Sequence, residues 1–252
     1  MEVDTLKEEN NIDRLKCDLG LLSRPDGSAL FTEGQTVVLA ALYGPVEVKM
    51  QKVLVEKASI ECIYKPKAGF PCVQDRFKES FIKNICETSL AVSLYPRSTI
   101  LVNIQEMQNH GQLLSCAINA ACMACLDSGI DMKFLFGSVS CFLMKDGELS
   151  LIPPVNESSI KGMFVFVFNN TKGEVIASHT EGLFTAEQYH DALEGGRQMG
   201  VAAYVKRGTR SPFVCHLSLS ERRGGTRRHD NDMLLPLRPE LGDHPGYRAM
   251  FF

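Results

Sequence analysis

The stretch that decides the fold is RPDGSALFTEGQT, residues 24–36, which runs directly into the apolar block VVLAALY, residues 37–43. Pro-Asp-Gly is a strong turn signal, because proline presets one backbone angle of a turn and glycine tolerates the strained one. A short apolar segment follows, and then a second turn centred on Gly34. The pattern predicts two strands joined by a tight turn, with the longer second strand buried.

Alternating and helical patterns continue after this hairpin. Residues 59–64 alternate like a half-buried strand, and the prolines and glycine of 65–71 indicate a loop. Apolar residues at helical spacing predict an amphipathic helix over about 75–94. A further strand is expected over 98–107, and a helix that is apolar nearly all round is expected over 113–126.

The second half of the chain repeats the order of strands followed by a helix. Thr185 and Gln188 form a capping box, which predicts that the last helix begins there. Gly195-Gly196 weakens that helix and predicts close packing at this point. The predicted elements are strands at 137–144 and 149–152 joined by Lys145-Asp146-Gly147-Glu148, strands at 163–168 and 175–179, and a helix to about Val205.

Length and composition describe a globular chain with an uneven charge. The 252 residues are 44% hydrophobic, so the chain can bury a core as one large or two small domains. No apolar run approaches the roughly 20 residues of a membrane span, and the acidic start is unlike a secretory signal. We therefore expect a soluble intracellular protein with no membrane partner.

The charge is divided between an acidic body and a basic tail. Residues 1–205 hold 18 Lys and Arg against 25 Asp and Glu, and residues 206–252 hold 9 against 5. An acidic body argues against nonspecific nucleic-acid binding over the whole surface, so RNA contact requires a local basic patch. The composition of the tail predicts disorder, and a flexible RNA-contacting arm is the alternative.

The nine cysteines indicate a reducing compartment. Cys122 and Cys125 form a CxxC pair, which is compatible with redox or zinc chemistry. The pair lies in an apolar helical pattern with no second ligand pair nearby, and free cysteine is commonly buried as a small apolar residue. The pattern favours two core residues.

Three segments together carry a family resemblance: RPDGSALFTEGQTVVLAALYGP (24–45), YKPKAGFP (64–71) and GQLLSCAINAACMACLDSGI (111–130). From about Leu15 to Val205 the chain resembles the RNase PH family, the phosphorolytic RNA exonucleases and their exosome relatives. The resemblance implies an α+β, RNase PH-like fold (ribosomal protein S5 domain 2-like), with duplicated β-α units, mixed sheets and packed helices. The expected organisation is an N-terminal extension (1–14), the RNase PH-like domain (15–205) and the basic tail (206–252).

The resemblance also implies a phosphate site at the start of the helix over 113–126. The family has Thr-Arg where this chain has Leu113 and Leu114. Leucine cannot hold phosphate, and without a guanidinium the pocket loses its charge-assisted anchor. Helix amides near Gln112 are the remnant of the phosphate site, so we expect phosphate binding to be lost or weak.

A second family feature, a set of spaced aspartates, is reduced to one acid. Ile152 stands at the first Asp position, and Glu157 is the carboxylate that remains in 149–161. A single carboxylate binds a divalent ion poorly. We predict no metal site and no catalytic residue, with Glu157 as the remaining candidate for a metal ligand or base and a solvated loop acid as the alternative.

Basic residues gather where the family lines its RNA path. Arg76 and Lys83 are seven residues apart, two helical turns, and therefore lie on one helix face. An ordinary solvated helix face is the alternative for this cluster, and an interface salt bridge is the alternative for Arg97. The predicted RNA-binding residues are Lys65, Lys67, Arg76, Lys78, Lys83 and Arg97.

Two functional hypotheses follow from the resemblance. In the first, the chain is a non-catalytic subunit in a hexameric ring of RNase PH-like exosome subunits, with cap subunits above, threading RNA for 3′-to-5′ processing and degradation. It would then need no cofactor and would work in the nucleus, nucleolus and cytoplasm. In the second, it is a homodimeric nuclease on RNA or DNA that uses inorganic phosphate or Mg²⁺.

Overall fold

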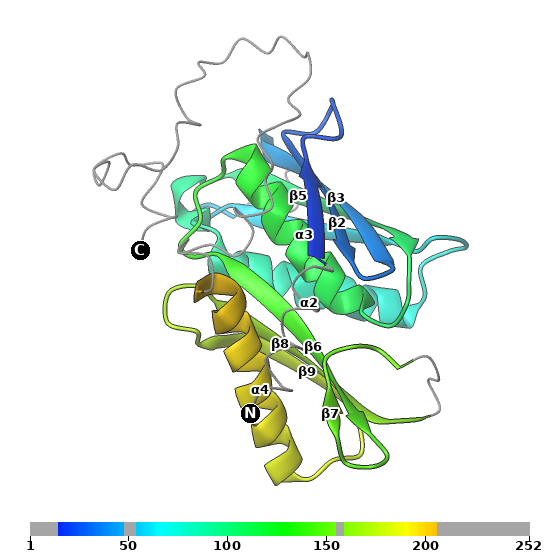
Figure 1. Ribbon diagram of the computed structural model, residues 1–252. Helices are drawn as coiled ribbons and strands as arrows, with labels where there is room; N and C mark the ends of the chain where they lie inside the picture. The colour runs from blue at the N-terminus through cyan, green and yellow to red at the C-terminus, as the bar shows by residue number, and fades with distance from the viewer. Residues whose placement is uncertain (1–14, 48–53, 155–158, 206–252) are drawn as a thin grey trace.

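The computed structural model describes residues 15–47, 54–154 and 159–205, and for 198–205 it describes the helix backbone alone. Its first layer is a five-stranded mixed sheet in the order β1-β2-β3-β5-β4 (Figure 1). β4 runs parallel to β5, and the other neighbours are antiparallel. The strands are β1 (Leu15–Leu19), β2 (Gly27–Glu33), β3 (Thr36–Glu47), β4 (Ser59–Lys65) and β5 (Ser98–Gln108).

The predicted hairpin of β2 and β3 is confirmed, and so is its turn at Gly34, whereas at the predicted turn around Pro25-Asp26-Gly27 the chain only bends before β2 begins. The Asp26 backbone N–H donates to the Leu42 carbonyl at 2.9 Å, and Gly34 adopts φ 63° in the turn between the strands. Alternate residues of β2, Ala29 and Phe31, are buried in the core. β1 was not predicted, although its apolar residues Leu15, Cys17 and Leu19 alternate with charged ones and Gly20 follows with φ 66°.

Helix α3 (Leu113–Ser128) packs against the first sheet and also contacts β6 of the second (Figure 1). As predicted, it is buried nearly all round. Small side chains allow close approach: a Cβ on Gly27 would lie 2.3 Å from the Ala124 carbonyl oxygen. Cys122 and Cys125 are both free thiols in this core, as the apolar pattern indicated.

Helix α2 covers Val73–Ser89, so the prediction that it continues to residue 94 was wrong. Leu90 is extended and forms a β-bridge with Met132, and the Ala91 N–H donates to the Asp131 carbonyl. These long-range hydrogen bonds replace the next helical turn. A short 3₁₀ helix, η2 (Val92–Leu94), follows instead.

The second layer is an antiparallel sheet in the order β7-β6-β8-β9. Helix α4 (Ala186–Val205) lies along this sheet (Figure 1) and begins with the predicted capping box: the Thr185 N–H donates to Gln188 at 3.0 Å. β7 ends at Ser150, two residues earlier than predicted, because the Ser150 hydroxyl and the Ile152 backbone hydrogen-bond across a bend. The strands are β6 (Phe136–Met144), β7 (Leu149–Ser150), β8 (Ile160–Asn169) and β9 (Val175–Gly182).

β8 joins the two layers because both of its faces are buried. Val165 and Val167 belong to the main core, whereas Phe164 and its alternate neighbours face Tyr189 of α4. A Cβ on Gly196 would lie 3.4 Å from Phe166, so close packing occurs there; at Gly195 the space is open, contrary to prediction. The α+β fold of two β-α units is confirmed.

Candidate nucleic-acid interface

The outer edge of β4 borders an open groove with a volume of about 930 Å³. Every residue of β4 lines it, with the loop after the strand on one side and α2 on the other. No strand of the described residues pairs with this edge. Of the six predicted RNA-binding residues, four line this groove: Lys65, Lys67, Arg76 and Lys83.

The first turn of α2 is fixed by Asp75, whose carboxylate accepts the Cys72 backbone N–H at 2.9 Å and the Lys78 ammonium at 3.1 Å. Burial opposes the ionisation of Asp75, but these hydrogen bonds outweigh it and hold its pKa below the usual value. The Lys78 ammonium also lies 4.8 Å from the centre of the Tyr64 ring. Lys78 therefore supports the helix start and does not line the groove.

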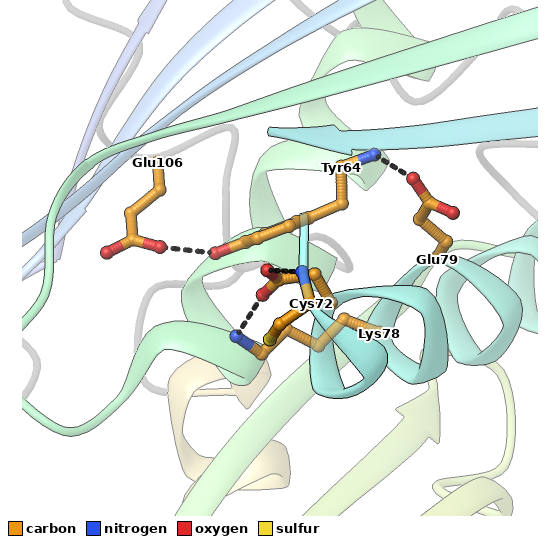
Figure 2. A network of polar contacts seen from close by, with 6 residues as sticks. Tyr64, Cys72, Lys78, Glu79 and Glu106 are labelled. Atoms are coloured by element: carbon orange, nitrogen blue, oxygen red, sulfur yellow. Dashed lines mark hydrogen bonds and ion pairs between the residues drawn. The ribbon is translucent and has the colours of Figure 1, made fainter. Parts of the chain in front are cut away.

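Tyr64 is fully buried and connects the strands to α2 (Figure 2). Its hydroxyl donates to the Glu106 carboxylate at 2.7 Å, and its backbone N–H donates to Glu79 at 3.0 Å. Burial, and next the hydrogen bond to Glu106, raise the pKa of the Tyr64 phenol, which therefore remains a neutral donor. This network anchors the end of β4 where the basic loop begins.

The cations of α2 are each paired with an acid of the same helix. Arg76 lies 3.3 Å from Glu79, and Lys83 lies 3.8 Å from Glu87. Lys65 and Lys67 are exposed and have no ion pair among the described residues. The groove therefore holds two cations that are paired with acids, Arg76 and Lys83, and two that are not, Lys65 and Lys67.

Arg97 lies apart from this set. It is exposed, adopts φ 57°, and its backbone N–H donates to the Leu54 carbonyl. Its side chain does not line the groove.

A second cleft, of about 1250 Å³, lies at the start of α3 and contains the predicted phosphate remnant, Gln112. Gln112 is 6% exposed, and its side-chain amide donates to the Leu151 carbonyl at 2.9 Å. Leu113 and Leu114 are buried. Gln112 thus holds the segment after β7, and no guanidinium of the described residues lines the cleft.

Glu33 is a cleft residue that the sequence reasoning missed. It is half-buried, and its carboxylate accepts the Ser115 hydroxyl at 2.9 Å. Burial raises the pKa of Glu33 to about 7, and the Ser115 hydrogen bond only partly opposes this. The strand alternation contained the signal, because Glu33 shares its face with Ala29 and Phe31. The other charged or titratable residues lining this cleft are Lys16, His110, Lys161 and Glu181.

Glu157 lies outside the described residues. Within the ranges that the structure describes, no three His, Cys, Asp or Glu side chains are placed to hold a metal ion. Nor is any helix of these ranges long and apolar enough to cross a membrane.

Comparisons with known proteins agree with the fold and with the sequence motifs. Residues 12–131 match the model of the 3′ exoribonuclease family, domain 1. The chain is 35% identical to the exosome complex exonuclease RRP46 homolog of Arabidopsis thaliana, over 78% of this chain and 91% of that protein. It is 31% identical to the homolog from Oryza sativa subsp. japonica, over 75% and 87% respectively.

Two solved structures share the architecture. The crystal structure of rice Rrp46 matches with a TM-score of 0.69 and 34% identity, over 76% of this chain and 89% of that chain. An archaeal exosome core chain matches with a TM-score of 0.62 and 15% identity, over 82% and 99%, a likeness that concerns the fold alone. The motifs, the fold and these matches together establish that the chain belongs to the 3′ exoribonuclease family of RNase PH-like proteins.

Proposed function

We propose that this chain is a ring subunit of an RNA exosome core, in which it lies among other RNase PH-like subunits and supports 3′-to-5′ RNA processing and degradation. The relatives named as exosome complex RRP46 proteins support this role, because they match over most of their length. The subunit contacts RNA through the groove beside β4. Its other partners are further ring subunits, completing a hexamer, and cap subunits.

The observation that supports a non-catalytic role is the start of α3. Buried Leu113 and Leu114 stand where phosphorolysis needs an anion anchor, and the Gln112 side chain is used to hold the segment after β7. A scaffolding subunit does not need the Thr-Arg pair that the family uses to bind phosphate. Such a subunit has no resident cofactor, and it works in the nucleus, the nucleolus and the cytoplasm.

A homodimeric nuclease on RNA or DNA is the second candidate, and one feature favours it. Burial raises the pKa of Glu33 to about 7 in the second cleft, which is the range required of a general acid or base. In that case inorganic phosphate or Mg²⁺ would take part in the reaction.

The test is incubation of the purified chain with 3′-extended, end-labelled RNA, with and without phosphate and Mg²⁺. We expect no release of nucleotides. Release of nucleoside diphosphates that requires phosphate would overturn the non-catalytic role, and Glu33→Gln and Glu157→Gln variants would then identify the acid responsible. Native mass measurement, of the chain alone and with candidate ring subunits, tests self-association against ring assembly.

A further inference from the structure

Glu79 contacts two different parts of the groove with its two carboxylate oxygens. Oε1 accepts the Tyr64 backbone N–H at 3.0 Å, and Oε2 accepts an Arg76 guanidinium N–H at 3.3 Å (Figure 2 shows the first contact). The Glu79 side chain is 14% exposed, whereas that of Arg76 is 72% exposed. The carboxylate is thus the fixed member of the pair, and the guanidinium is the member that can move.

The fixed position of Glu79 has a structural reason. The Tyr64 N–H belongs to the outer edge of β4, and an edge amide without a partner would favour pairing with another chain. Glu79 satisfies that donor and therefore stays in the groove. Its charge must then be met by Arg76 or by an incoming cation.

An RNA phosphate that approaches Arg76 meets this carboxylate. The phosphate must replace Glu79 as the partner of the guanidinium, and juxtaposed like charges are costly. Lys65 and Lys67, which have no ion pair among the described residues, impose no such exchange. An RNA strand long enough to contact these lysines and Arg76 together gains enough from the lysines to offset the cost of displacing Glu79 from Arg76, whereas a single phosphate does not.

We propose that Glu79 is a positioning residue that holds Arg76 against the β4 edge and competes with RNA phosphates for it, so that the groove selects extended RNA strands over short oligonucleotides. This inference rests on the proposed RNA contact and concerns how that contact is regulated. In this proposal Glu79 both satisfies a backbone N–H at the edge of β4 and lowers the affinity of the groove for RNA.

The decisive variant is Glu79→Gln, because an amide oxygen can still accept the Tyr64 N–H while the negative charge is lost. RNA binding is measured by fluorescence anisotropy with oligouridylates of about 4 and about 12 nucleotides at several salt concentrations. We expect affinity for the longer RNA to rise about threefold to tenfold, with a larger gain for the shorter one. For the shorter RNA, the slope of log K against log salt should steepen by about one, because Arg76 then gains a phosphate that it does not hold with this RNA in the unmodified chain; for the longer RNA, which already reaches Arg76, the slope should not change.

Glu87→Gln is the matched control. It removes the same charge from the same helix, but its pair with Lys83 is exposed on both sides, so affinity should change by less than about twofold. In a second control, Arg76→Ala is combined with Glu79→Gln, and the gain should then disappear. If Glu79→Gln leaves affinity unchanged, or if the gain persists without Arg76, the inference is overturned.

A measurement on the unmodified chain covers the case in which Glu79→Gln fails to fold. ¹⁵N NMR of the Arg76 side-chain N–H should shift when RNA is added, as its partner changes from carboxylate to phosphate; an unchanged signal on RNA-saturated protein would refute the exchange. Failure of the proposed RNA contact itself is distinguishable, since charge reversal at Lys65 and Lys67 would then leave RNA binding intact.

Discussion

Replacing Glu33 by glutamine should stabilise the protein at neutral and alkaline pH but not at acidic pH. The glutamine side chain would keep an acceptor for the Ser115 hydroxyl and would remove the ionisable group from the second cleft. Burial raises the pKa of Glu33 from 4.5 to about 7, so the folded state holds the proton more tightly than the unfolded state does. The contribution of Glu33 to the free energy of unfolding of the unmodified chain therefore falls as pH rises from about 4.5 to about 7.

The magnitude follows from that difference in pKa. At about 1.4 kcal/mol per unit, the full displacement corresponds to roughly 3 kcal/mol, and the partial exposure of Glu33 reduces this to about 1–2 kcal/mol. Below about pH 4.5 the carboxyl is protonated in both states and contributes no penalty. The advantage of the variant should consequently appear across this window and then remain constant above about pH 8.

The assay is urea unfolding at intervals from about pH 4.5 to about pH 8.5, comparing the unmodified chain with Glu33→Gln. Glu148→Gln is the control, because Glu148 is an exposed acid whose side chain makes no ion pair among the described residues. Parallel pH profiles for the unmodified chain and Glu33→Gln would refute the reasoning.

Three further results are expected. The double charge reversal Arg76→Glu and Lys83→Glu should weaken RNA binding and reduce its salt slope by about two, and unchanged affinity at low salt would place the RNA path elsewhere. Tyr64→Phe should cost about 1–3 kcal/mol in urea unfolding, since it leaves a carboxylate without its donor, and a loss under about 0.5 kcal/mol would contradict the assigned network. Gly27→Ala should destabilise the chain by about 2 kcal/mol or more, because its Cβ would lie 2.3 Å from the α3 backbone. Gly195→Ala should stabilise the chain by up to about 1 kcal/mol, because the space around this helical residue is open. Both are measured by thermal unfolding, and equal shifts in the two variants would be inconsistent with the packing.

Local signals in the sequence predicted local structure well. The turn at Gly34 and the capping box at Thr185 depend on residues within a few positions of one another. The end of α2 could not be predicted in this way. Leu90 continues the apolar spacing, but its bridge to Met132 joins segments far apart in the chain.

The candidate groove was predictable only in part. Helical spacing placed Arg76 and Lys83 on one face, and both line the groove. The same spacing could not show that Lys78 turns toward Tyr64, because that contact comes from β4. Glu33 was recoverable from strand alternation, whereas its raised pKa depends on its surroundings in the assembled cleft.

The ion pairs along α2 also bear on how quickly RNA would reach the proposed contact in the groove. Opposite charges a few ångströms apart form local dipoles, whose field decays well within the roughly 10 Å over which salt at about 0.1 M screens a charge. The helix therefore adds little to electrostatic steering, and diffusional encounter should not be accelerated by it. If the groove binds RNA as proposed, any electrostatic steering of the strand comes from Lys65 and Lys67 in the loop after β4 and not from α2.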